Sequence, residues 1–279
     1  MSDRRALVTR VLPLVLVLGM AGAWLLPATG ALELAGDPGA ADRWTAALDE
    51  LPDAPTVLVG FDPDLGTYAE IRPTVRTAIA DLLARNARLV LVSLTPEGRA
   101  LGLAELARLE RYDANPTRVL DLGYLSGAEA ALVAIARQPS VPASASGALA
   151  GRLRDEGIAA VDAVIVIGGN DLGPRTWIEQ LQPRMERVPF LAIAPATLLP
   201  ELQPYLAGGQ LAGLLGTPRD GAAYRATASL GALDRIAAGD EPPTLPILLG
   251  MLVAIAVLGQ AWVARAGTTV GSLGREGRE

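Results

Sequence analysis

The chain has 279 residues, a formal net charge of −6, and hydrophobic side chains at 51% of its positions. It contains no histidine and no cysteine, and its 24 basic residues are all arginine. These absences exclude disulfides, Ser-His-Asp and Cys-His catalysis, zinc sites of the Cys/His kind, the Walker phosphate loop and Schiff-base chemistry. Any catalysis would depend on carboxylates, hydroxyls, arginine or a metal held by carboxylates.

Two apolar segments, residues 11–32 and 242–264, contain no charged side chain. Each has about the 20 residues that a helix needs to cross a bilayer. Arginine dominates the flanks at residues 1–10 and 265–279, and the acidic excess lies between the segments. This pattern predicts a two-pass cell-membrane protein with both termini cytoplasmic and the central part extracytoplasmic. The alternative for the first segment is a cleaved signal peptide.

Residues 33–54 are rich in alanine, aspartate, proline and glycine, which predicts a linker with one short helix. An α/β domain is expected over residues 55–241, because apolar runs alternate there with helix-periodic stretches. The predicted strands are residues 56–61, 89–94, 118–122, 163–167 and 190–194. We expect a Rossmann-like or flavodoxin-like three-layer domain with a mostly parallel sheet of about five strands. Thr67 with Glu70, and Ser126 with Glu129, are spaced as capping boxes.

Polar and glycine-rich loops follow the predicted strands, where open parallel sheets bind ligands. The candidate ligand-binding residues are Asp62, Asp64, Ser93, Tyr124, Gly168, Gly169, Asn170 and Asp171. Asp62, Asp64 and Asp171 could hold Mg²⁺, because hard cations take carboxylate oxygens. The simpler alternative is that these residues form ordinary turns. No other cofactor is predicted.

Two further chemistries are weighed at the same loops. The glycines from Gly168 onward resemble a phosphate-binding turn, but G-x-G-x-x-G spacing and lysine are missing, and Asp171 would repel phosphate. Asp62 with Glu70, or Asp121 with Glu129, could act as an acid and a base. The acidic excess disfavours nucleic acid as a partner.

A glycine-rich stretch occupies residues 207–216 and is followed by a tyrosine. Small residues allow backbones to approach closely, which suits a packing or oligomer contact. The residues assigned to it are Gly208, Gly209, Gln210, Gly213 and Tyr224. A loop that closes over the sheet is the alternative.

Several short pieces occur in a fixed order along the chain. They are Phe61-Asp62-Pro63, Glu70-Ile71-Arg72-Pro73, Leu122-Gly123-Tyr124 with Gly127 and Glu129, Pro204-Tyr205, Gly209 to Leu215, and Gly221-Ala222-Ala223-Tyr224. Together they resemble an uncharacterised family of bacterial and archaeal membrane proteins with a terminal transmembrane helix at each end and an α/β domain between. That family has an acidic residue after the final tyrosine, where this chain has Arg225. The resemblance implies no activity and no catalytic residues.

The leading hypothesis is a non-enzymatic, membrane-anchored extracytoplasmic scaffold or interaction module within a membrane protein assembly. Its expected partners are the lipid bilayer and other membrane proteins or a second copy of the chain. One alternative is a sensor that binds a small ligand or divalent metal through the strand-end loops. The other is a carboxylate-dependent hydrolase, or a degenerate relative of a hydrolase or peptidase.

Overall fold

The computed structural model describes residues 38–111, 118–185, 187–228 and 230–234. No helix in these ranges is long and apolar enough to cross a membrane. The longest, α3 (Leu65–Ala84), has 20 residues but carries Glu70, Arg72, Arg76 and Asp81. The two predicted spans, residues 11–32 and 242–264, lie outside the described residues. The prediction of a two-pass membrane protein with cytoplasmic termini therefore has no support and is withdrawn.

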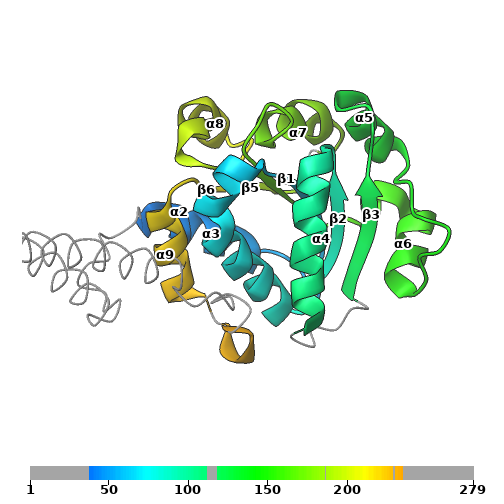
Figure 1. Cartoon of the computed structure of the whole chain (residues 1–279), viewed down its shortest axis with the longest axis horizontal. Helices are drawn as coiled ribbons and strands as arrows, with labels where there is room; N and C mark the ends of the chain where they lie inside the picture. Colours follow the sequence, from blue (N-terminus) through cyan, green and yellow to red (C-terminus); the bar gives the residue numbers. More distant parts are fainter. Residues whose placement is uncertain (1–37, 112–117, 186, 229, 235–279) are drawn as a thin grey trace, which may run out of the picture. The chain divides into compact units, whose positions relative to one another are not determined.

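Six strands form one parallel sheet in the order β3-β2-β1-β4-β5-β6 (Figure 1). Their bounds are β1 (Thr56–Asp62), β2 (Arg88–Ser93), β3 (Val119–Tyr124), β4 (Ala163–Gly168), β5 (Phe190–Ile193) and β6 (Gly213–Leu215). This order is typical of dinucleotide-binding domains and confirms a Rossmann-like α/β fold. The short sixth strand was not predicted.

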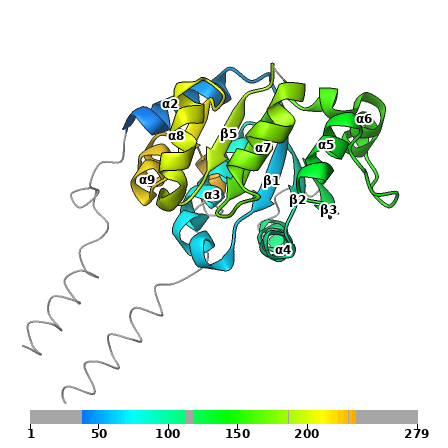
Figure 2. The same cartoon turned by 90° about the horizontal axis from the view of Figure 1, so that it is seen from above.

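Helices cover both faces of the sheet. The remaining α-helices are α2 (Pro38–Asp49), α4 (Pro96–Arg111), α5 (Glu129–Arg137), α6 (Ala148–Glu156), α7 (Pro174–Leu181), α8 (Leu199–Ala207) and α9 (Pro218–Thr227). Short 3₁₀ helices occupy Gly157–Ala160, Gln182–Arg184, Ala196–Leu198 and Gly231–Leu233. One hydrophobic cluster joins the sheet to α2, α3, α4 and α9, and another joins it to α5, α6, α7 and α8. Figure 2 shows α4 on the opposite side of the strands from α5 and α6.

The alternation of side chains along β1 explains these two clusters. Val57, Val59 and Phe61 belong to the first cluster, whereas Leu58 belongs to the second. Both faces of a strand that is buried on both sides must be apolar, so the nearly continuous apolar run was a reliable signal for it.

Helix α2 is part of the domain rather than of a linker. Trp44 is completely buried in the first cluster, and its ring meets that of Tyr224 edge to face at 5.8 Å between centroids. The short helix predicted in this segment is therefore present as α2, and a single large aromatic side chain fixes it to the domain, because burying that side chain supplies much apolar contact.

Neither predicted capping box forms. Asp64 is the N-cap of α3, where its side chain accepts the Thr67 backbone N–H, and Glu70 instead accepts the N–H of Ala196. The N-cap of α5 is Ala128, which has no side-chain cap. The spacing of Thr67 and Glu70 does not determine where α3 begins, because Asp64, three residues before Thr67, caps the helix instead.

Candidate functional site

The candidate site lies where β1 and β4 end. The strands β1 to β3 extend the sheet in one direction and β4 to β6 extend it in the other, so the strand order reverses between β1 and β4. Ligands of this fold class bind in the crevice beyond the carboxyl ends of the strands at such a point. Asp62 is the last residue of β1 and pairs in register with Gly168, the last residue of β4. The structure therefore brings these two predicted site residues together.

Asp62 is completely buried and is held by the loop after β2. Its Oδ1 accepts the backbone N–H groups of Leu94 at 2.6 Å and Thr95 at 2.9 Å, and the Thr95 hydroxyl at 3.2 Å. Burial raises the pKa of this carboxyl from its ordinary value of 3.8 to about 6, although these hydrogen bonds oppose the rise. A carboxyl with such a pKa titrates between the acidic and neutral ranges.

Three buried polar atoms at this end of the sheet have no hydrogen-bond partner in the described part of the chain. They are Oδ2 of Asp62, Oγ of Ser93 and Nε1 of Trp177. The Trp177 indole contributes to lowering the pKa of Asp62, but no hydrogen bond of normal geometry joins its Nε1 to Oδ2. A polar group that is buried without a hydrogen bond is costly, so these three atoms contribute unfavourably to the stability of this end of the sheet.

Asp64 occupies the N-terminus of α3. Its two carboxylate oxygens accept the Thr67 N–H at 2.9 Å and the Thr67 hydroxyl at 2.5 Å. Slight burial raises the pKa of Asp64, but the hydrogen bonds outweigh it and hold the pKa below the ordinary value. In dinucleotide-binding proteins the pyrophosphate binds at this helix end, so the carboxylate stands where a phosphate would lie.

The loop after β4 packs directly on the loop after β1. The Asn170 side chain donates to the backbone oxygen of Asp62 at 2.9 Å and accepts the Leu172 N–H at 2.9 Å. A β-carbon on Gly169 would collide with the Thr67 hydroxyl. The crevice between β1 and β4 is therefore filled by the residues that line it.

Asp171 does not join the other acids. The hydrogen bond that it makes is through its backbone oxygen, which accepts the Thr176 hydroxyl at 2.7 Å. Within the described ranges no three acidic side chains are grouped so that they could hold a metal ion. Asp62, Asp64 and Asp171 therefore do not form such a group among the described residues.

The other predicted residues lie apart from this centre. Tyr124 ends the outer strand β3 and is exposed. Gly213 packs on Trp44 and Tyr224 on Asp81, so both serve internal contacts. The remaining members of the predicted contact, Gly208, Gly209 and Gln210, are exposed after α8.

Thr95 and Trp177 belong to the site but are not among the candidate residues from the sequence. The Thr95 hydroxyl also accepts the Gly98 N–H at 3.0 Å. Trp177 lies on the apolar face of α7. Their proximity to Asp62 depends on the packing of α4 and α7 on β1, and no local sequence pattern indicates it.

No protein-family model matches the chain, and no curated protein matches its sequence significantly. The resemblance to a family of membrane proteins is corrected by this finding, together with the absence of a membrane-crossing helix among the described residues. The pieces that suggested it have local structural roles. Asp62 ends a strand, Gly123 adopts a φ of +88°, and Tyr224 binds a buried aspartate.

Proposed function

We propose that this domain is a non-catalytic protein-interaction module built on a dinucleotide-type fold. The observation that carries the proposal is the filled crevice between β1 and β4. Asn170 joins the two loops through the backbone of Asp62, and Gly169 leaves no space beside Thr67. A ligand could enter the usual position only if this contact broke.

The electrostatics of the crevice argue against a nucleotide. The N-terminus of α3 is capped by the ionised Asp64, and the backbone amides that begin the α4 loop are taken by Asp62. A carboxylate of the chain thus occupies the positive end of α3, and a second one lies against the loop that leads into α4. A bound pyrophosphate would have to displace at least one of them.

A carboxylate-dependent hydrolase is disfavoured because a substrate has poor access to the carboxylates. The pKa of Asp62, about 6, would suit a general acid or base. The residue is completely buried, however, and its closest acidic neighbour in sequence, Asp64, is engaged as a helix cap. A substrate would not reach Asp62, and Asp64 is held in its cap by two hydrogen bonds from Thr67.

The surface around α4 supports an interaction role. Large apolar side chains are exposed at Leu65 (67%), Leu103 (47%) and Tyr124 (45%). The Leu65 N–H donates to Glu97 in the first turn of α4, and Arg99 of the same helix pairs with Asp121 of β3. Leu65 and Tyr124 therefore flank the start of α4, which carries Leu103. We propose that a protein partner, including a second copy of the chain, packs on this surface.

The test compares the full chain with Leu103→Glu and with Ala130→Glu, a control at an exposed position of α5. Sedimentation at rising concentration measures self-association, and crosslinking in cells followed by purification measures other partners. Leu103→Glu should weaken the association at least about tenfold, because a charge in an apolar contact is costly. The control should leave it unchanged.

Two results would contradict the proposal. The first is a wild-type chain that stays monomeric at every concentration and crosslinks to no partner. The second is a saturable rise in melting temperature with NAD, ATP or another nucleotide, which would show that the crevice opens for a ligand after all.

A further inference from the structure

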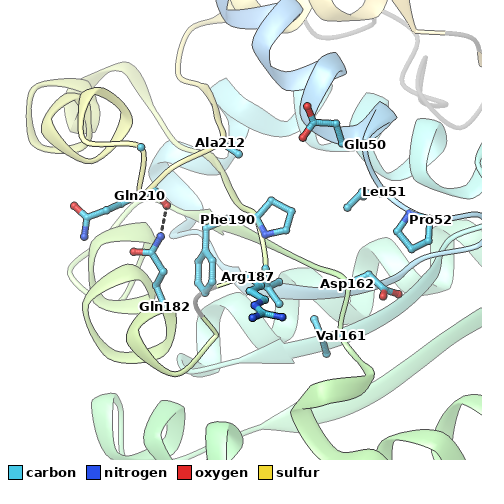
Figure 3. Close-up of a pocket in the computed structure, with 13 residues that line it drawn as sticks. Glu50, Leu51, Pro52, Val161, Asp162, Gln182, Arg187, Phe190, Gln210 and Ala212 are labelled. Carbon is cyan, nitrogen blue, oxygen red and sulfur yellow. Dashed lines mark hydrogen bonds between the residues drawn. The ribbon is translucent and has the colours of Figure 1, made fainter.

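The two edges of the sheet differ in how their polar side chains are arranged. At the amino-terminal edge, Glu50, Asp162 and Arg187 are among the residues that line a hollow of about 560 Å³ (Figure 3). Figure 3 shows the Glu50 carboxylate turned away from the hollow and separated from the other two, so these charges do not converge on a ligand. At the carboxyl-terminal edge, in contrast, buried polar atoms without partners lie beside a short loop that closes the crevice between β1 and β4.

That loop consists of residues 169–172, which we call the flap. Its two ends are held together, because a β-carbon on Gly168 would stand only 2.7 Å from Cα of Gly173. Leu172 is the one large apolar side chain of the flap, and it is only half-buried. A segment with so little buried apolar surface opens at a low free energy, and the close ends allow it to move while β4 and α7 stay in place.

Hydrogen bonds rather than apolar contacts hold the flap closed. The Asn170 side chain donates to the backbone oxygen of Asp62 at 2.9 Å, and the backbone oxygen of Asp171 accepts the Thr176 hydroxyl at 2.7 Å. Thr176 is buried at this contact. Opening of the flap therefore uncovers the Thr176 side chain and the end of β1 together.

The end of β1 gains hydrogen bonds when the flap opens. Oδ2 of Asp62 and Nε1 of Trp177 are buried and have no hydrogen-bond partner among the described residues. Water that enters beneath the open flap can bond to both atoms. Burial also raises the pKa of the Asp62 carboxyl from 3.8 to about 6, so a solvated carboxyl gives up its proton more readily than the buried one.

We propose that the flap is controlled by a proton: it is held closed while Asp62 is protonated and opens more often once Asp62 has lost that proton to water. Because Asp62 has a pKa of about 6 under the closed flap and the ordinary value of 3.8 when solvated, the equilibrium constant for opening rises with pH. It increases about tenfold between pH 5 and pH 7.5. This change does not require the interaction surface at α4, so either proposal can fail its test without the other.

Other charged groups also face this end of the sheet. They lie on the loop after β1, the first turn of α4, the flap and α7, and they are Asp64, Glu97, Arg99, Asp171, Arg175 and Glu179. Slight burial raises the pKa of Asp64, but its hydrogen bonds outweigh this and hold the pKa below the ordinary value, so Asp64 stays ionised from pH 5 to pH 7.5. Asp62→Asn removes the titration of Asp62 alone and leaves all of these groups in place.

The test measures how fast a buried thiol reacts, and the background is clean because the chain has no cysteine. Thr176→Cys places a thiol under the flap. Its rate of labelling by a water-soluble disulfide reagent is divided by the rate for the same variant unfolded in urea at the same pH, which removes the pH dependence of the thiol itself. This ratio should rise about tenfold between pH 5 and pH 7.5.

Three further variants identify the cause. Thr77→Cys is the matched control, because Thr77 is also buried on a helix and also donates to a backbone oxygen, that of Pro73 at 3.0 Å. Its ratio should be far lower at every pH, since α3 is not covered by the flap at that position. Asp62→Asn combined with Thr176→Cys should give a ratio that does not change with pH. Asn170→Ala in the same background should raise the ratio about tenfold at every pH, because it removes the bond to Asp62.

Hydrogen exchange in the wild-type chain reads the same opening if Thr176→Cys fails to fold. The Gly173 N–H donates to the backbone oxygen of Asn170 at 2.9 Å, and its exchange rate, corrected for that of an unstructured peptide at the same pH, should show the same rise. Three outcomes would overturn the proposal. The thiol at position 77 reacts as fast as that at position 176, which would indicate global unfolding; or the rise with pH survives Asp62→Asn; or the corrected exchange rate of Gly173 does not change with pH.

Discussion

The indole ring of Trp177 lies so close to Gly60 that a β-carbon at position 60 would stand 2.5 Å from its Cζ2. Trp177 is completely buried on α7, and Gly60 lies in β1, between β2 and β4. The absence of a side chain at Gly60 therefore creates the space for the indole beside Asp62. The glycine is needed for packing, since its φ is not positive.

Replacing Gly60 with alanine should lower the free energy of unfolding by about 1–3 kcal/mol, because an overpacked core forces neighbouring groups to shift. Gly151→Ala in α6 is the control. A β-carbon there meets nothing within 4 Å, and alanine should raise stability by up to about 1 kcal/mol in a helix. Urea denaturation measures both. Equal effects of the two changes would contradict the contact between Gly60 and Trp177.

The pH dependence of stability tests the environment of Asp62. Its pKa is about 6 in the folded protein against an ordinary value of 3.8, so the folded state disfavours the ionised form. The resulting destabilisation is full above pH 6 and disappears as the pH falls toward 4. A shift of this size corresponds to about 3 kcal/mol.

Asp62→Asn keeps an oxygen that accepts the Leu94 and Thr95 N–H groups but removes the titration. The unfolding free energy of this variant minus that of the wild type should therefore rise by about 2.5 kcal/mol between pH 4 and pH 7. Denaturation at several pH values measures the difference, in which the contributions of all other acids cancel. A difference that stays constant with pH would show that Asp62 has an ordinary pKa.

Strands were predictable where burial on both sides demanded a continuous apolar run. Residues 56–61, 89–94, 163–167 and 190–194 met that condition, and each is a strand. β6 did not meet it, because it has only three residues within a glycine-rich stretch. The register and order of the strands depend on contacts between distant segments, which the local pattern does not contain.

The sequence predicts where in the fold the site lies, but not how its side chains are arranged. Asp62 and Gly168 were identified because they end apolar runs, and the fold brings them together. That Asp62 is buried, and that Asn170 closes the crevice through the Asp62 backbone, depends on how two loops far apart in sequence pack. A turn composition rich in Asp, Asn and Gly is common to open binding loops and to filled ones.

The contact between α9 and α3 can be tested at Tyr224. Its hydroxyl donates to Oδ2 of Asp81 at 2.6 Å, and both residues are buried. Tyr224→Phe would leave that oxygen without its donor and should cost about 1–3 kcal/mol of stability. Tyr205→Phe is the control, because its hydroxyl makes an equally short bond of 2.6 Å to Glu179 at the surface. Water can replace the surface donor, so a cost at Tyr205 as large as that at Tyr224 would contradict the role of burial.

The buried carboxylate of Glu105 holds α3 and α4 together. It accepts the Tyr68 hydroxyl at 2.8 Å and forms ion pairs with Arg76 at 2.9 Å and Arg108 at 2.6 Å. Burial raises the pKa of Glu105, but the hydrogen bonds from the two arginines outweigh it and hold the pKa below its ordinary value. This stabilisation is therefore complete above the unfolded-state pKa and is lost as the pH falls through the folded-state pKa.

Glu105→Gln should lower the free energy of unfolding by about 3 kcal/mol at neutral pH, because the buried Arg108 and the half-buried Arg76 lose the charge that they share. Glu156→Gln removes an exposed partner of Arg152 four residues away on the same helix and should change stability little. The deficit of Glu105→Gln should shrink in acid, where the wild-type carboxylate is itself protonated. The unfolding free energy of Asp62→Asn minus that of the wild type becomes more positive as the pH rises, whereas the same difference for Glu105→Gln becomes more negative. Denaturation of both variants across one pH series therefore distinguishes a carboxylate that stabilises the domain from one that destabilises it. If the two differences changed with pH in the same direction, one of these two assignments would be wrong.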